Sequence, residues 1–566
     1  MGKQSLVALD TDHIKQYVFA TDKLKEIRGA SSILDRLNRP GMQDIAKDVD
    51  QNAQLIFANG GAGLFEVDTD KADEFGKQVQ QTFRERTAGS ATITYVVQEL
   101  PDGKAKIKDE LAMMRYQLRA VKNCPEDIII LPSHPFMRPC SSCGIEYAEG
   151  DGGVGLHDPG EQDAIFCTSC QKKRWEDIGV KKSIDYYVGT QSVKEQGHIE
   201  SPLWLGIIHT LGNIGYHIPK GTQRPGDFND FRNFGKAKDY IGLIYADGNG
   251  MGRKIEELNT LPEIRDFAEA VDTSIYRAVC DAIKEHLPVW EGVNQESSEK
   301  EHLFPFDLLL LGGDDVVMVT SAAVAVEVAR TIATSFHKYT REKDPKKQGH
   351  TLSIGVVLAP VKYPFGLLQE LAESALKHAK TEGAKRRDTT TSAYGDTFIN
   401  FMTVTGSTSH DFKKVYKSLY DRHVKVSGHK SEVAFYATLR PYTVEELDFL
   451  LNMIREGKKM GLGRTKLHQV REAVLQMNLT TSVYEGMALL RNWRSRQRDF
   501  VTQFVREMGW HYQKPHSDEE KPGTMFPRAI FPWFADGPDA YKTPLLDFVE
   551  LYDFVAQEEE EDAGAN

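Results

Sequence analysis

The sequence lacks both a long hydrophobic run and a targeting pattern at its start. No apolar stretch approaches the roughly 18 residues needed to cross a bilayer. The first residues, MGKQSLVALDTDH, lack the basic, apolar and small-residue order of a signal peptide. Cysteine is also scarce, with six in 566 residues, and most of them form one tight group instead of a disulfide framework. We therefore expect a cytoplasmic protein with no membrane contact.

Excess positive charge is missing as well. The net charge is −12 at pH 7, partly from an acidic tail at residues 558–562. The chain as a whole therefore does not favour polyanions, and any contact with nucleic acid requires local basic patches. The length exceeds the roughly 250 to 300 residues at which single cores stop growing, so three or four domains are expected.

Two segments of the sequence predict the same order of elements. Residues 1–105, the first unit, and residues 236–400, the second unit, each contain a strand, a helical stretch, an apolar hairpin, a helix and a strand. This order predicts two α+β domains. Residues 106–235 are expected to form linker helices with a cysteine-containing insert at about 136–175. Residues 401–566 have helical periodicity, which predicts a C-terminal helical domain.

The two units also align in detail. LVALDTDHI lies over LIYADGNGM, so Asp10 matches Asp247. IFANGGAGLFEV lies over LLLLGGDDVVMV, so residues 60–63, GGAG, match residues 312–315, GGDD. In this alignment Ala62 and Gly63 replace the two aspartates. We interpret the first unit as a degenerate copy that kept the turn and lost the carboxylates, although two unrelated α+β domains could also align this faintly.

The strongest chemical signal is the segment LLLLGGDDVVMV, in which two β-rich arms flank a tight turn. Adjacent aspartates at a buried hairpin tip repel each other, and Mg²⁺ relieves the repulsion while it binds substrate phosphates. The alternative is a surface turn without metal. Asp247 favours the metal site because it ends an apolar strand, and neighbouring strands lie about 4.8 Å apart. It can therefore share ions with Asp314 and Asp315.

These three aspartates predict a catalytic site for two-metal nucleotidyl transfer. Two Mg²⁺ or Mn²⁺ ions would serve the attacking hydroxyl and the leaving pyrophosphate. Glycines at the turns allow a triphosphate to approach the backbone closely, and lysines at a helix end could bind its phosphates, although the helix dipole alone also favours cations there. The expected nucleotide-binding residues in this unit are Gly248, Asn249, Gly250, Gly312, Gly313, Lys380 and Lys385.

The grouped cysteines form two CxxC knuckles, CSSC and CTSC, separated by a loop. This spacing is typical of a tetrahedral zinc ribbon. We therefore predict structural Zn²⁺ held by Cys140, Cys143, Cys167 and Cys170.

Together these motifs resemble the large polymerase-like subunit of type III CRISPR effector complexes, which makes cyclic oligoadenylates from ATP. The resemblance rests on DGNGMG from Asp247, GGDD, the pair LSIGVV and AKTEGAKRR that is also similar to GGDEF diguanylate cyclases, and the Cys₄ insert between two palms. KLKEIRGASSILDRLN in the first unit and RPYTVEEL from Arg440 are similar to that family too.

The resemblance implies two ferredoxin-like palm domains of the nucleotide cyclase and polymerase type. It implies a second ATP held by the first palm, with Ser31 and Ser32 at a helix start facing that nucleotide. It also implies guide RNA and other effector subunits as partners, target RNA as activator, and a role in antiviral defence. Asn249 stands where related sequences often have a second Asp.

The family commonly begins with a His-Asp nuclease domain, whereas no such pair precedes the first palm in this sequence. The isolated His410 and Asp411 lack partner histidines, so we predict no DNase activity. Two other functions stay open. The chain could be an RNA-binding scaffold whose nucleotide site only senses ligand, or a standalone dinucleotide cyclase that works without RNA.

Overall fold

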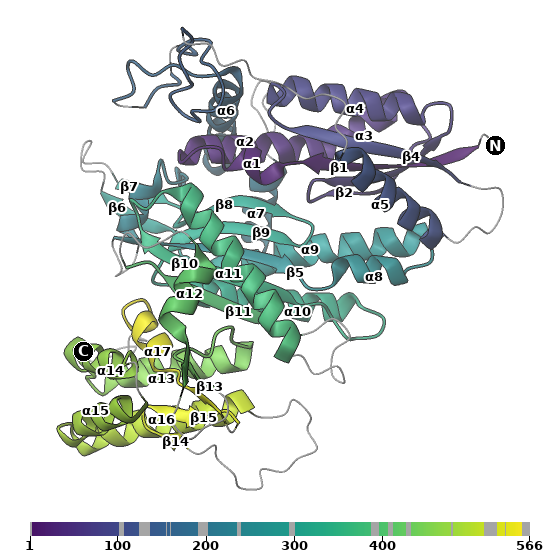
Figure 1. Ribbon diagram of the computed structural model, residues 1–566. Coiled ribbons are helices and arrows are strands. Elements are labelled where there is room, and N and C mark those ends of the chain that lie inside the picture. The colour runs from purple at the N-terminus through teal and green to yellow at the C-terminus, as the bar shows by residue number, and fades with distance from the viewer. Residues whose placement is uncertain are drawn as a thin grey trace.

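The computed structural model describes residues 3–100, 107–123, 136–153, 155–158, 160–190, 202–234, 239–293, 300–386, 396–405, 411–425, 432–476, 479–513, 529–537 and 539–556. The predicted acidic tail and His410 lie outside these residues. No helix in this part of the chain is long and apolar enough to span a bilayer. Figure 1 shows the first unit stacked on the second, with the C-terminal segment on the far side of the second unit.

The first unit forms a four-stranded antiparallel sheet in the order β2-β3-β1-β4. Every second residue of its central strand, such as Val7 and Leu9, is buried against helices. The elements are β1 (Gln4–Asp12), α1 (Ile14–Val18), α2 (Leu24–Arg36), η1 (Leu37–Gly41), α3 (Met42–Val49), β2 (Gln54–Asn59), β3 (Ala62–Asp68), α4 (Ala72–Thr87) and β4 (Thr92–Glu99).

The second unit repeats this topology and adds one strand. Its sheet has the order β11-β10-β5-β9-β8, so β5, β8, β9 and β10 take the places of β1, β2, β3 and β4. The shared β-α-β-β-α-β order is that of a ferredoxin-like fold. The elements are β5 (Tyr240–Gly248), α8 (Met251–Glu257), α9 (Leu261–His286), β6 (Trp290–Val293), β7 (Lys300–Leu303), β8 (Phe306–Gly312), β9 (Asp315–Ser321), α10 (Ala325–Lys343), β10 (Leu352–Pro360), α11 (Phe365–Arg386) and β11 (Phe398–Thr403).

Strand pairing corrects the predicted alignment of the two hairpin tips by one residue. The last pair before the turn is Asn59 with Ala62 in the first unit and Gly312 with Asp315 in the second. Matching these pairs places residues 61–62, and not residues 62–63, at the positions of Asp314 and Asp315. Both hairpins therefore close with two-residue turns, and the first residue of each turn is a glycine with positive φ.

The insert between the units docks on the first unit. Its long helix α6 (Thr168–Thr190) begins within the second CxxC knuckle and crosses α2 closely, since a Cβ on Gly29 would overlap the backbone carbonyl of Lys173. Arg174 is buried beneath the insert and forms ion pairs with Glu26 of α2 at 2.5 Å and with Glu161 at 2.7 Å. Two further helices and a 3₁₀ turn complete this region: α5 (Ile107–Asn123), α7 (Pro202–Asn213) and η2 (Phe228–Asn233).

The C-terminal segment contains the predicted helices together with a sheet that the sequence did not reveal. The helices are α12 (Phe412–Tyr420), α13 (Val444–Lys459), α14 (Arg464–Val474), α15 (Leu479–Arg491), α16 (Ser495–Gln513) and α17 (Leu545–Tyr552). The strands form the order β12-β13-β16-β15-β14, with bounds β12 (Asp421–Lys425), β13 (Glu432–Tyr436), β14 (Ala529–Ile530), β15 (Trp533–Ala535) and β16 (Ala540–Lys542). Strands of two to five residues are too short for a recognisable alternating pattern.

Candidate active site

The three predicted aspartates meet at one end of the second sheet. β5 and β9 are adjacent and antiparallel, and Ala246 pairs with Val316. The next residue on β5, Asp247, therefore lies beside Asp315 at the start of β9. Asp314 occupies the turn and packs its carboxylate against Gly248, where an added Cβ would overlap it. The strand order thus brings together carboxylates that are far apart in the sequence.

Burial and mutual repulsion disfavour the charged forms of the two hairpin carboxylates. Burial and the Asp247 charge raise the pKa of Asp314 to about 6. Burial, Asp247 and Asp314 raise the pKa of Asp315 to about 8, although Lys15 and Lys380 act in the opposite direction. A divalent cation held by these oxygens would keep both hairpin carboxylates ionised. The chemistry of the oxygen donors fits Mg²⁺ or Mn²⁺, which Asp247, Asp314 and Asp315 would hold.

Of the two predicted lysines, only Lys380 reaches the carboxylates. Its ammonium contacts the Asp247 carboxylate and donates to the Gly248 carbonyl oxygen at 3.2 Å. Lys385 lies on the exposed face of α11, where it pairs with Glu382 at 2.7 Å. In this structure the helix end therefore supplies one cation to the site.

The predicted glycines and Asn249 shape the loops around the aspartates. Gly250 has a φ of 72° and begins α8, and Gly313 has a φ of 63° at the hairpin turn. The amide of Asn249 is buried behind the site, where it donates to Thr351 Oγ1 at 3.1 Å and accepts from Ser353 Oγ at 2.8 Å. Asn249 therefore fixes the loop to Thr351 and to Ser353 of β10.

The tips of the two hairpins touch. A Cβ on Gly60 would lie 3.3 Å from the Gly312 carbonyl oxygen, and a Cβ on Gly312 would lie 3.2 Å from the Gly60 nitrogen. Beside this contact Arg39 of the first unit pairs with both oxygens of Asp272 on α9, at 2.9 and 3.0 Å. The degenerate turn of the first unit therefore faces the carboxylate-bearing turn of the second.

A small cavity of about 100 Å³ separates the two units next to this contact. Ser31 lines it, as do Lys15 and Asn38 of the first unit and Asp315 of the second. Ser32 does not, because its hydroxyl donates to Glu176 Oε1 at 2.8 Å in the opposite direction. Of the two predicted serines, the structure brings only Ser31 towards the carboxylates.

No sequence pattern predicted a role for Lys15 or a lysine at the degenerate site. Lys15 reaches across to Glu373 on α11, with Nζ 2.8 Å from Oε1. Lys122 of α5 lies 2.7 Å from Asp10 and 3.0 Å from Asp12. Both contacts join elements distant in sequence, and a lone lysine carries no local pattern.

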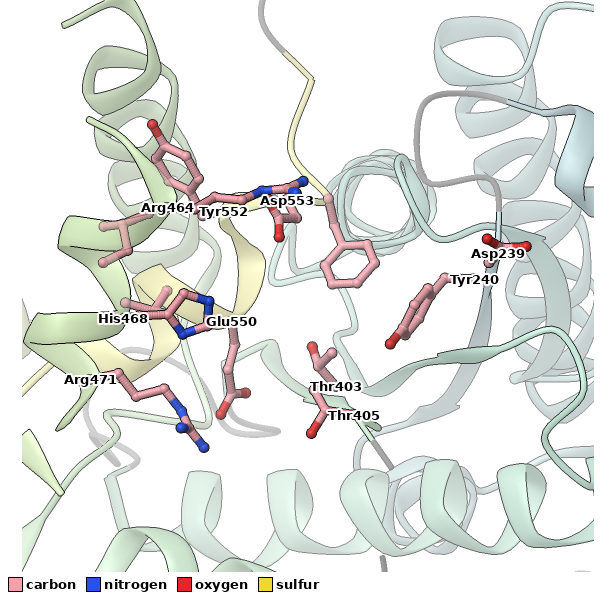
Figure 2. A pocket seen from close by; sticks show the side chains of 13 residues that line it. Asp239, Tyr240, Thr403, Thr405, Arg464, His468, Arg471, Glu550, Tyr552 and Asp553 are labelled. Atoms are coloured by element: carbon pink, nitrogen blue, oxygen red, sulfur yellow. Dashed lines mark hydrogen bonds and ion pairs between the residues drawn. The ribbon is translucent and has the colours of Figure 1, made fainter. Parts of the chain in front are cut away.

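A larger cavity, of about 630 Å³, lies elsewhere, between the second unit and α14 (Figure 2). Tyr240 lines it at the start of β5, whereas Asp247 lies about 23 Å away along the same strand, given about 3.3 Å per residue. Arg464, His468 and Arg471 of α14 form the opposite wall. This cavity is separate from the carboxylates.

The four grouped cysteines form a compact cluster. Their sulfur atoms all lie within 4.8 Å of one another, and Cys143 Sγ is 3.9 Å from Cys167 Sγ. Tetrahedral Zn–S bonds of about 2.3 Å require sulfur separations of this size. Cys140, Cys143, Cys167 and Cys170 could therefore hold one zinc ion at the end of the insert that contacts α2.

Comparisons with known proteins relate the unit that carries these carboxylates to a protein family. Residues 240–390 match the family model described as Cas10/Cmr2, second palm domain. These residues are a Cas10/Cmr2 palm domain. The CRISPR system Cmr subunit Cmr2 of Pyrococcus furiosus is 28% identical over 168 residues, which cover 28% of this chain and 19% of that subunit. The predicted relationship to the large subunit of type III CRISPR complexes is confirmed.

Solved structures share the fold beyond this palm domain. A Csm1–Csm4 cassette in complex with pppApApA has a TM-score of 0.54 and 11% identity, over 91% of this chain and 67% of that chain. The apo Csm1–Csm4 cassette has a TM-score of 0.52 and 12% identity, over 91% and 68%. The likeness extends the common fold over both units, the insert and the C-terminal segment.

Proposed function

We propose that this chain joins nucleoside triphosphates, and most specifically ATP, through 3′–5′ bonds into a cyclic oligonucleotide. The observation that carries the proposal is the meeting of Asp247 with Asp314 and Asp315 at a buried strand end that faces a second copy of the same fold, whose hairpin tip has no carboxylates. Csm1–Csm4 cassettes of similar fold bind AMPPNP, pppApApA and cA3. Those ligands favour an adenine nucleotide as substrate.

The proposed reaction is a displacement at phosphorus. A 3′-hydroxyl oxygen bonds to the α-phosphorus of a second nucleotide, the bond to the bridging oxygen of pyrophosphate breaks, and the hydroxyl proton leaves to solvent. Bound Mg²⁺ or Mn²⁺ would lower the pKa of the hydroxyl and stabilise the leaving pyrophosphate. Asp247, Asp314 and Asp315 would hold the ions, and Lys380 would exchange its contact with Asp247 for a phosphate oxygen.

We also propose that the reaction takes place in a complex with other proteins and RNA. The relation to Cmr2 favours assembly with other type III CRISPR subunits and guide RNA, with target RNA as activator and antiviral defence as the role. Co-purification of tagged protein from its host, followed by RNA sequencing and mass spectrometry, tests this assembly. Recovery of the chain alone, active without RNA, would instead support a standalone cyclase.

The decisive experiment incubates purified protein with labelled ATP and Mg²⁺ or Mn²⁺, with and without guide and target RNA, and separates the products by chromatography and mass spectrometry. We expect cyclic products from the wild type and none from the double variant Asp314→Ala, Asp315→Ala. If the wild type and the double variant give the same product profile with every triphosphate, the chain is not a nucleotidyltransferase. A complex that retains its RNA-guided function in the double variant would support the scaffold function.

A further inference from the structure

We propose that Lys15 is a phosphate-binding residue that the first unit contributes to the nucleotide site of the second. This inference rests on the proposed function and specifies one contact within it. Lys15 belongs to α1, which follows β1 directly, and its side chain crosses to the face of the second sheet. Its Nζ lies 5.1 Å from the centre of the Tyr245 ring on β5.

The position of Lys15 relative to the carboxylates supports a role in ligand binding. It lines the cavity between the units together with Asp315 and Gly312. Lys380 contacts Asp247 from α11, and the charges of both lysines act on Asp315. Two cations from different units thus flank the carboxylate cluster, as a site for a polyanion and its metal ions requires.

Lys15 can leave its present partner, Glu373, without leaving that carboxylate uncompensated. Glu373 accepts a hydrogen bond from Lys15 at 2.8 Å, but it also pairs with Lys377 at 2.7 Å, one turn further along α11. Gln369 donates to the other carboxylate oxygen at 3.2 Å. When Lys15 moves to a phosphate, Glu373 therefore keeps a cation and a hydrogen-bond donor.

The cavity has room for a phosphate group. At about 100 Å³ it holds several times the space that one water molecule needs, about 10–15 Å³ in the same measure. The polar side chains that line it from the first unit are those of Lys15, Ser31, Asp35, Asn38 and Arg39, and the backbone of Gly60 and Gly61 completes the lining. Arg39 pairs with Asp35 at 2.9 Å, so this carboxylate already has a cation and leaves the Lys15 ammonium to an anion. A phosphate here would lie between the Lys15 ammonium and metal ions on Asp315.

The test compares Lys15→Met with Lys377→Met, a matched control that removes the other ammonium from the same Glu373. Lys377 is 69% exposed and does not line the cavity, so it would not contact the phosphate. We expect Lys15→Met to weaken AMPPNP binding in calorimetric titrations with Mg²⁺ by about 10- to 100-fold, the size of a lost charge-assisted hydrogen bond. The KM for ATP should rise by a similar factor. Lys15→Arg should restore most of the affinity. Lys377→Met should lower it far less than Lys15→Met does, because Gln369 still donates to Glu373 when Lys15 moves.

Binding and product formation, measured together, distinguish a wrong role for Lys15 from a wrong proposed function. If the wild type makes product and Lys15→Met has the affinity and KM of Lys377→Met, the role of Lys15 is wrong and the proposed function stands. If AMPPNP binding depends on Lys15 but no product forms under any condition, the contact is right and nucleotide joining is wrong. Wild-type protein that binds no AMPPNP contradicts the contact. Thermal melting of both methionine variants shows whether a difference in binding arises from unfolding.

Discussion

Lys122 Nζ lies 2.7 Å from a carboxylate oxygen of Asp10, the residue that occupies in the first unit the place of Asp247 in the second. The same ammonium is 3.0 Å from Asp12, whose other oxygen accepts hydrogen bonds from Thr92 and Thr94. The first unit has thus kept a strand-end carboxylate pair, and a lysine of α5, from the region between the units, neutralises it. A lysine there excludes a second cation by charge and by space.

Removal of this lysine should create a metal site in the first unit. In a background of Asp314→Ala and Asp315→Ala, which removes the ligands of the second unit, Lys122→Met should bind about one additional Mn²⁺. The signal of free Mn²⁺ in electron paramagnetic resonance measures the stoichiometry. A further substitution, Asp10→Asn, should abolish the binding of the additional Mn²⁺. If Lys122→Met alone does not change the stoichiometry, Lys122 does not occupy a cation position.

The raised pKa values predict an opposite pH dependence for stability and for metal binding. Burial raises the pKa of Asp314 to about 6 and of Asp315 to about 8, above the usual value near 4. The folded state therefore favours the protonated forms. Their contribution to stability is complete below about pH 4 and is lost as the pH rises through 6 and 8, at a cost on the order of 1–3 kcal/mol.

Thermal melts in EDTA between pH 5 and 9 test this prediction. The wild type should lose more stability across this range than Asp315→Asn, which cannot ionise. Mg²⁺ should raise the melting temperature most at pH 8 and above, because the ion competes with protons for the same oxygens. Equal pH slopes for the wild type and the Asn variant would contradict the raised pKa of Asp315.

Gly248 and Gly252 form a matched pair for testing the packing at the carboxylates. A Cβ on Gly248 would overlap the Asp314 carboxylate and lie 2.7 Å from Met251 Cε, whereas a Cβ on Gly252 meets nothing within 4 Å. Gly248→Ala should therefore displace Asp314 and lower product formation by at least about 100-fold in a folded protein. Gly252→Ala should leave activity unchanged and stabilise α8 by up to about 1 kcal/mol. Similar activity of the two variants would rule out a requirement for Asp314 at this position.

Loss of zinc should affect the first unit as well as the insert. Cys170→Ser should lower the zinc content from about one ion per chain to near zero, as measured by plasma mass spectrometry. Arg174, buried between the insert and α2, connects the cysteine cluster to Glu26. We therefore expect increased hydrogen exchange in α2 as well as in the insert. Wild-type protein without zinc, or a variant whose α2 exchanges as before, would contradict this coupling.

Local patterns in the sequence predicted most of the fold and the central part of the candidate site. Alternating apolar strands and amphipathic helices gave every strand of the first sheet and four of the five strands of the second, because these elements bury one face against a large core. β11 was missed, since it lies parallel to β10 and is separated from it by α11. Asp247 was found because a carboxylate at the end of an apolar strand is unusual.

The remaining features depend on register and on docking. The predicted alignment of the two hairpin tips was wrong by one residue because it matched the GG pairs of the two units with each other. In the structure, bulges after Leu55 and after Leu308 set the register. Lys15, Lys122 and the pair of Arg39 with Asp272 acquire their roles only when separate elements pack together. No single stretch of sequence encodes such contacts.

The backbone contact between Gly60 and Gly312 limits how the two halves of the site can move. Because neither glycine has a side chain, the two backbones are in direct contact and the tips cannot come closer. A side chain at either position would meet the opposite backbone at 3.2–3.3 Å, so even alanine would push the two halves of the site apart by a few tenths of an ångström. The spacing between the halves is thus set by the absence of two side chains.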